Sequence, residues 1–135
     1  MNAALIVAGS LAIVGAAIHG GVGEILVVRK LSPGTLPPSA LGGPGLTKAM
    51  IHASWHMTTV AFLTGGISLL LAGTALDGDT ARAVAAIAAA AFTGFALIAV
   101  AAGGVHSRPR SLYRHPGPAL LAATAALAWW GALAL

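Results

Sequence analysis

The side chains that could bind a metal ion are few in this sequence, and they are histidines and one glutamate. The chain has five histidines, three acidic residues and no cysteine. His52 and His56 are spaced i, i+4, so both imidazoles project from one face of a helix and could bind one metal ion. The absence of cysteine excludes disulfides and thiolate ligands, which leaves imidazole and carboxylate as donors for iron, copper, zinc or manganese.

His19 and Glu24 lie in an earlier apolar stretch, five residues apart. In a regular α-helix this spacing separates their directions by about 140°, which argues against a shared face. The glycine-rich residues 20–23 between them could admit a π-bulge, and the two side chains would then converge. Close helix packing is the commoner role of such glycines. We expect Glu24 to be a metal ligand; alternatively, it orients a ligating histidine by accepting its N–H.

The remaining histidines lie beside the third connection of the chain. His106 follows Gly103 and Gly104, whose lack of side chains leaves room for a flat cofactor or a close helix. His115 precedes Pro116 and is predicted to be structural. The predicted metal site therefore comprises His19, Glu24, His52, His56 and His106.

Two other interpretations use the same residues. A single b-type haem could be held by two histidines from different helices, for example His19 and His56. Histidines of membrane helices also form purely structural interhelical hydrogen bonds. The spacing alone leaves a metal ion, a haem and a hydrogen-bond network all open.

The elements that must position these residues are apolar helices. The 135 residues are 58% hydrophobic and 7% charged, with a mean hydropathy of +0.91, which is too apolar for an ordinary soluble surface. Residues 3–28, 49–76, 83–105 and 117–135 are each about long enough to cross a bilayer. We expect the first to be a span and not a cleaved signal peptide, because no Lys or Arg precedes it. The short connections predict an all-α, integral membrane, four-helix up-down antiparallel bundle that forms a single domain over residues 1–135.

The charged residues predict how this bundle is oriented. The first and third connections hold six basic residues, namely Arg29, Lys30, Lys48, Arg108, Arg110 and Arg114, whereas the second holds Arg82 beside two aspartates. By the positive-inside rule, both termini face outward. Counting about 1.5 Å per residue from the flanking cations places His19 and His56 roughly 12–15 Å from the cytoplasmic edge, and Glu24 and His52 about half as deep. The candidate site is therefore predicted in the cytoplasmic half.

Two short motifs resemble a known group of proteins. His19 and Glu24 form an H-x4-E pattern, and residues 55–59 read W-H-M-T-T. This combination resembles small four-helix bacterial inner-membrane proteins, over roughly the first half of the chain. The resemblance implies the bacterial inner (cytoplasmic) membrane and a multi-pass topology, but no activity.

These observations favour a membrane protein that binds a transition metal or a haem, with oxidoreductase chemistry as one use of the site. Whether it is an enzyme is left open. One alternative is a proton-coupled small-solute transporter or channel subunit, in which Glu24 and the histidines titrate. Another is a structural subunit of a larger membrane complex. The expected partners are the lipid bilayer and either further copies of the chain or a larger complex, but not nucleic acid, because the seven Lys and Arg lie in short connections.

Overall fold

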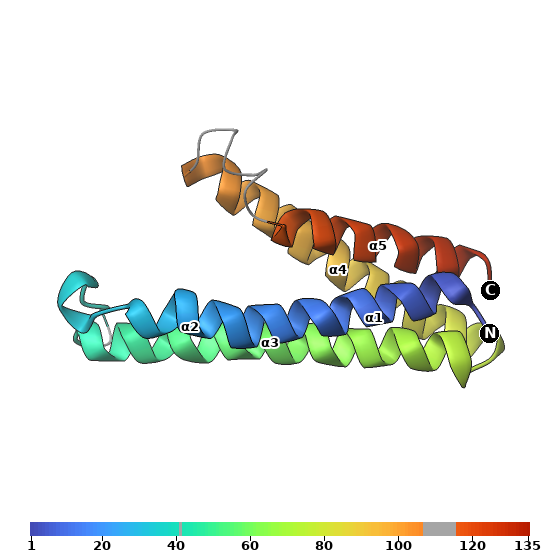
Figure 1. Ribbon diagram of the computed structural model, residues 1–135, viewed down its shortest axis with the longest axis horizontal. Helices are drawn as coiled ribbons and strands as arrows, with labels where there is room; N and C mark the ends of the chain where they lie inside the picture. The colour runs from blue at the N-terminus through green and yellow to red at the C-terminus, as the bar shows by residue number, and fades with distance from the viewer. Residues whose placement is uncertain (41, 107–115) are drawn as a thin grey trace. The chain divides into compact units, whose positions relative to one another are not determined.

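The described part of the chain consists of helices joined by short connections. The computed structural model describes residues 1–40, 42–106 and 116–135, with the side chains of 103–106 excepted. The elements in chain order are α1 (Ala3–Ala17), the π-helix η1 (Ile18–Gly23), α2 (Glu24–Leu26), the 3-10 helices η2 (Val28–Lys30) and η3 (Pro33–Thr35), α3 (Pro44–Thr74), α4 (Gly78–His106) and α5 (Gly117–Leu133). The expected all-α class is confirmed (Figure 1).

Within the described ranges, three helical runs are long and apolar enough to cross a membrane: Ala3–Lys30, Pro44–Thr74 and Gly78–Ala102. The run Gly117–Leu133 is apolar but shorter, and at 1.5 Å per residue it spans about 25 Å of a hydrocarbon core about 30 Å thick. The helices α3 and α4 begin earlier than hydropathy predicted, at Pro44 and Gly78. Hydropathy detects only the apolar part of a helix, whereas the hydrogen-bonded helix also includes its polar first turns. A tight turn precedes α4, with Gly78 at a φ of 56°.

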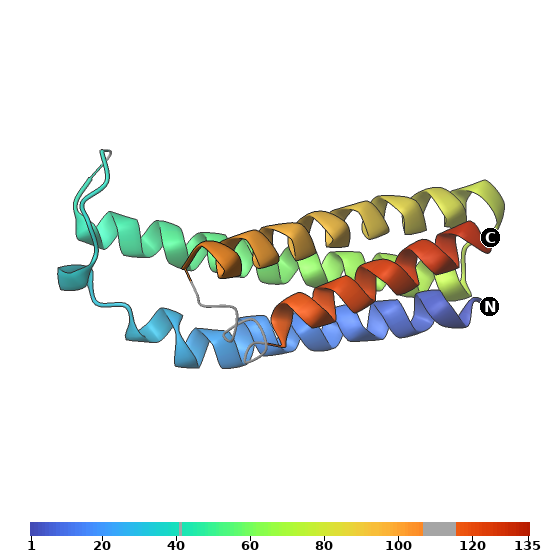
Figure 2. The same ribbon diagram turned by 90° about the horizontal axis from the view of Figure 1, so that it is seen from above.

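The chain forms two compact units, residues 1–15 with 62–135, and residues 16–61. In the first unit, α1 runs antiparallel to the end of α3, since the Asn2 N–H donates to the Gly73 carbonyl at 2.9 Å whereas Gly9, farther along α1, lies against Gly66. Glycine permits this close approach: a Cβ on Gly9 would lie 2.7 Å from the Gly66 carbonyl oxygen. In the same unit α4 packs against α5, which Figure 2 shows from above.

The second unit, residues 16–61, pairs the end of the first helical run with the first half of α3. The two segments are antiparallel, because Gly20 lies against Thr59 whereas Gly23 lies against Trp55. A Cβ on Gly20 would lie 2.6 Å from Thr59 Cγ2, and one on Gly23 would lie 2.5 Å from Trp55 Cζ2. These two glycines therefore allow η1 to approach α3 closely, and this unit contains the candidate site.

Candidate metal centre

The π-helix Ile18–Gly23 decides which way His19 and Glu24 face. In a π-helix the hydrogen bonds join residues five apart, so these two residues come onto nearly the same side instead of diverging by about 140°. The π-bulge alternative drawn from the glycine-rich sequence is thus confirmed. Both side chains are directed toward α3, where Glu24 meets two histidines and His19 meets Thr59.

Glu24, His52 and His56 form a compact group of ligand atoms. His52 Nε2 lies 3.3 Å from Glu24 Oε1, and His56 Nε2 lies 3.4 Å from Glu24 Oε2. One ligand atom from each residue can be chosen so that all lie within 4.8 Å of one another. The two imidazoles meet edge to face, with ring centroids 4.7 Å apart. The i, i+4 spacing on α3 therefore brings both rings to one carboxylate, as predicted.

Glu24 is largely withdrawn from solvent, although its partners are not. Its side chain is 13% exposed, compared with 50% for His52 and 42% for His56. Its Oε1 also lies 3.4 Å from the Nε of Arg29, a side chain that is 70% exposed. Its Oε2 is buried and makes no hydrogen bond with any described residue. His56 Nε2 lies near it at 3.4 Å without forming a hydrogen bond, and a buried carboxylate oxygen that lacks a hydrogen bond is costly, so this atom is suited to a cation.

The spacing of the group fits a small metal ion. Two donors at about 2.1 Å from a tetrahedral ion lie about 3.4 Å apart. The carboxylate–imidazole distances are close to this value, at 3.3 Å from Oε1 to His52 and 3.4 Å from Oε2 to His56, and ligand atoms taken one from each residue lie within 4.8 Å of one another. Two imidazoles and one carboxylate are the protein ligands of several catalytic zinc sites, and also of iron(II) sites that keep coordination positions open. The group could therefore hold a metal ion and still admit another ligand.

His19 lies beside this group and not within it. Its Nδ1 is 2.9 Å from Thr59 Oγ1, and Trp55 stacks on its ring with centroids 4.2 Å apart. The Trp55 indole N–H also donates to the His19 carbonyl at 3.0 Å. Because the Thr59 hydroxyl donates to the Trp55 carbonyl, the consistent assignment makes Nδ1 of His19 the protonated nitrogen. A metal-ligating or haem-ligating role for His19 stays a prediction.

The structure gives Trp55 a contact that the sequence did not predict. Its ring packs on His19, and its indole N–H donates to the His19 carbonyl. His106 ends α4, but its side chain lies outside the described residues, as does all of His115. Ligation by His106 therefore stays a prediction.

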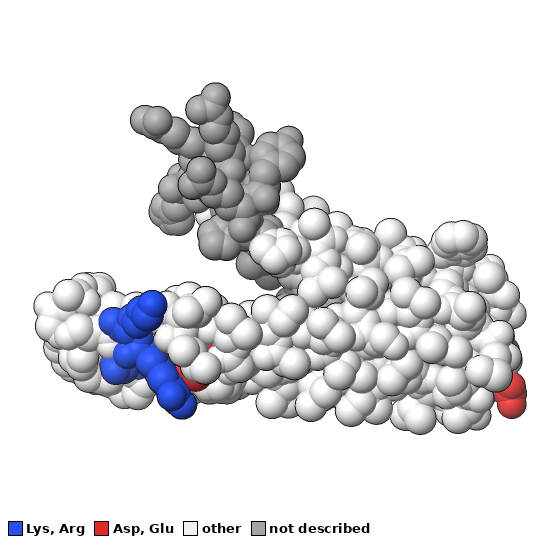
Figure 3. Space-filling view, in the orientation of Figure 1, with Lys and Arg blue, Asp and Glu red and all other residues white. Residues whose placement is uncertain are grey.

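Two cations near the site were interpreted from the sequence only as topology signals. Arg29 pairs with Glu24, and Lys48 lines an open hollow of about 570 Å³ next to it. The hollow is lined by Glu24, Val28, Arg29, Gly45, Lys48, Ala49 and His52. Lys48 could have been linked to the site from sequence, because Lys48, His52 and His56 follow one another at intervals of four and share a helix face. Figure 3 shows the basic side chains gathered beside an acidic one.

Models of known protein families, curated proteins and solved structures were compared with the chain, and none matches it. The fold and the site define a helical protein in which the described residues include three helices long and apolar enough to span a membrane. They also define a Glu/His/His group that could hold a metal ion.

Proposed function

We propose that this chain is an integral membrane protein that binds a divalent transition-metal ion through Glu24, His52 and His56. The observation that carries the proposal is the convergence of two imidazole nitrogens on the two oxygens of one largely buried carboxylate, at 3.3 and 3.4 Å. The buried Oε2 supports it, since it has no hydrogen bond among the described residues. An ion there would satisfy this oxygen, and three protein ligands would leave positions for a further ligand.

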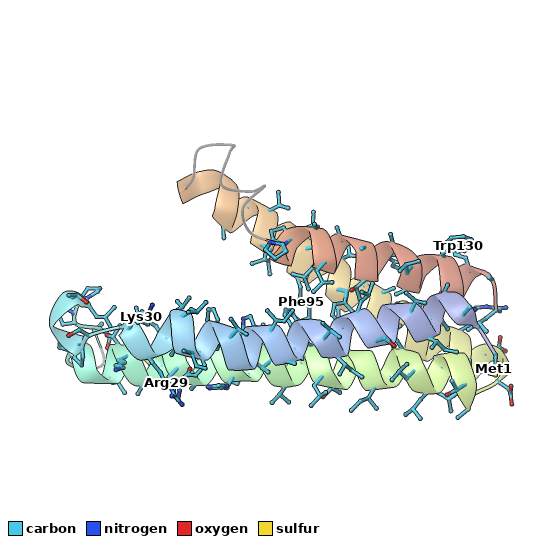
Figure 4. The ribbon with its side chains drawn as sticks, in the orientation of Figure 1. Met1, Arg29, Lys30, Phe95 and Trp130 are labelled. Carbon is cyan, nitrogen blue, oxygen red and sulfur yellow. The ribbon has the colours of Figure 1, made fainter. Side chains whose placement is uncertain are left out.

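We place this site in the cytoplasmic half of a four-helix bundle in the bacterial inner membrane, with both termini outside. Three helices of sufficient length and hydropathy support membrane insertion. Arg29 and Lys30, labelled in Figure 4, lie where the first helical run ends, a few residues beyond Glu24. The positive-inside rule assigns that end to the cytoplasm. The resemblance of the H-x4-E and W-H-x-T-T patterns supports the same membrane.

The donor set narrows the choice of metal. Imidazole and carboxylate suit iron(II), zinc and manganese better than copper(I), which prefers sulfur ligands. The thioether of Met57, which follows His56, would be such a sulfur ligand. Met57 is 71% exposed, so this thioether is directed largely away from the protein. Bound iron would make oxidoreductase chemistry available, whereas zinc has no redox chemistry and would act as a Lewis acid. The identity of the metal therefore decides which activity to assay.

Elemental analysis and cobalt titration of protein purified in mild detergent test the proposal. We expect about one metal ion per chain, and visible absorption on adding Co²⁺ to metal-stripped protein. The double variant His52→Ala, His56→Ala and the variant Glu24→Gln should lose both signals. Asp79→Asn is the matched control, because Asp79 is an exposed acid that pairs with Arg82 on the surface. A Soret band would establish the haem alternative, and folded wild-type protein that takes up no metal would refute the site.

A further inference from the structure

An open hollow of about 570 Å³ adjoins the metal-binding group and shares two of its residues. Glu24 and His52 line the hollow and also belong to the candidate metal centre. Val28, which is 1% exposed, and Ala49 supply apolar wall. A ligand in the hollow would therefore reach the metal from the side of Glu24 and His52.

The charges around the hollow select an anion. Arg29 and Lys48 both line it, so two cations face one carboxylate before any metal ion is counted. Arg29 uses its Nε toward Glu24, at 3.4 Å from Oε1, and a guanidinium has further N–H donors beyond that atom. Lys48 lies four residues before His52 on α3, about 6 Å along the helix. The metal, Arg29 and Lys48 would thus surround one small volume with positive charge.

We propose that this hollow binds a phosphate group, with one oxygen on the metal and the others at Arg29 and Lys48. The inference rests on the proposed function and names the ligand class of that same site. Phosphate fits better than a carboxylate, because it offers enough oxygens for three separate cationic groups and is the common partner of arginine and lysine. Its source is either free phosphate or the headgroup of an anionic phospholipid, since basic pockets between membrane helices bind such headgroups.

The test uses full-length protein loaded with Co²⁺ in detergent, with the cobalt content measured first. Inorganic phosphate is then titrated while the visible cobalt spectrum is recorded, and equilibrium dialysis with radiolabelled phosphate gives a second measurement. We expect a saturable change, with an affinity that falls about tenfold or more in Lys48→Gln and in Arg29→Gln. Lys30→Gln is the matched control, because Lys30 is equally basic, neighbours Arg29 and does not line the hollow. Cobalt content should be unchanged in Lys48→Gln and Lys30→Gln. Because Arg29 pairs with Glu24, the phosphate affinity of Arg29→Gln is measured on protein brought to the same cobalt content as the wild type.

Reconstitution into phosphatidylcholine vesicles with or without phosphatidic acid separates the two sources. A cobalt spectrum that changes with phosphatidic acid in the absence of free phosphate supports the proposal and assigns a lipid headgroup. A response to inorganic phosphate alone supports it and assigns the free ion. Cobalt uptake with no response to either probe overturns the phosphate site alone, as does an equal loss of affinity in Lys30→Gln. Folded protein that takes up no cobalt overturns the proposed metal site, and the phosphate site with it.

Discussion

Replacing Gly23 by alanine would strain the contact that holds Glu24 against α3. The new Cβ would lie 2.5 Å from Trp55 Cζ2, so the indole ring would have to move. That ring stacks on His19 and donates to its carbonyl at 3.0 Å. Overpacking of this kind costs about 1–3 kcal/mol, and losing the hydrogen bond costs about 1 kcal/mol more. Alanine recovers up to about 1 kcal/mol of helix propensity, so we expect a net destabilisation of about 2 kcal/mol.

Gly21→Ala is the matched control, because it lies in the same π-helix and a Cβ there would meet nothing within 4 Å. We expect it to be neutral or to stabilise by up to about 1 kcal/mol. The free energy of unfolding of both variants can be measured by titrating the folded protein in mild detergent with a denaturing detergent. Cobalt affinity, measured alongside, should fall in Gly23→Ala because Glu24 is the next residue. Equal stability and equal cobalt affinity of the two variants would refute the close-approach argument.

Three further outcomes follow from the same geometry. Glu24→Gln should weaken cobalt binding by about 100-fold or more in a competition titration with a chelator. The control Asp79→Asn should leave cobalt binding unchanged. Retention of tight binding in Glu24→Gln would contradict ligation by the carboxylate. Thr59→Val should destabilise the protein by about 1–2 kcal/mol, because it removes the 2.9 Å contact between Thr59 Oγ1 and His19 Nδ1, and it should keep its cobalt. Thr58→Val is the control, since the Thr58 hydroxyl donates to the Ser54 carbonyl of its own helix. Acidification should release cobalt, because protons compete with the metal for imidazole; an affinity that rises or stays constant from neutral to acidic pH would argue against histidine ligands.

Much of the fold follows from local features of the sequence. Apolar stretches of about 20 residues predict helices wherever they occur, because each backbone group in lipid must find its partner within its own segment. The pairing of His52 with His56 on one face is equally local, since it depends only on the turn of an α-helix. The acidic and glycine residues 77–79 likewise predict the turn that the structure contains.

Local features did not decide that Glu24 is the residue that meets His52 and His56. Whether Glu24 faces α3 depends on whether residues 18–23 form a regular α-helix or a π-helix, as they do in the structure. A glycine-rich sequence allows both conformations. Packing against α3 accompanies the π-helix, with Trp55 filling the space beside Gly23 and bonding the His19 carbonyl. Arg29 and Lys48 came to the same hollow by this tertiary approach, although they lie 19 positions apart in the sequence.

The sequence by itself thus determined the apolar helices and the histidine face of α3, because helical periodicity is a property of each segment alone. Only the tertiary structure decided that Glu24 completes that face while His19 lies beside it with Thr59. The physical reason is that these contacts depend on how closely two helices approach and on one extra residue in a helical turn. Neither quantity is encoded in the spacing of the residues that form the site.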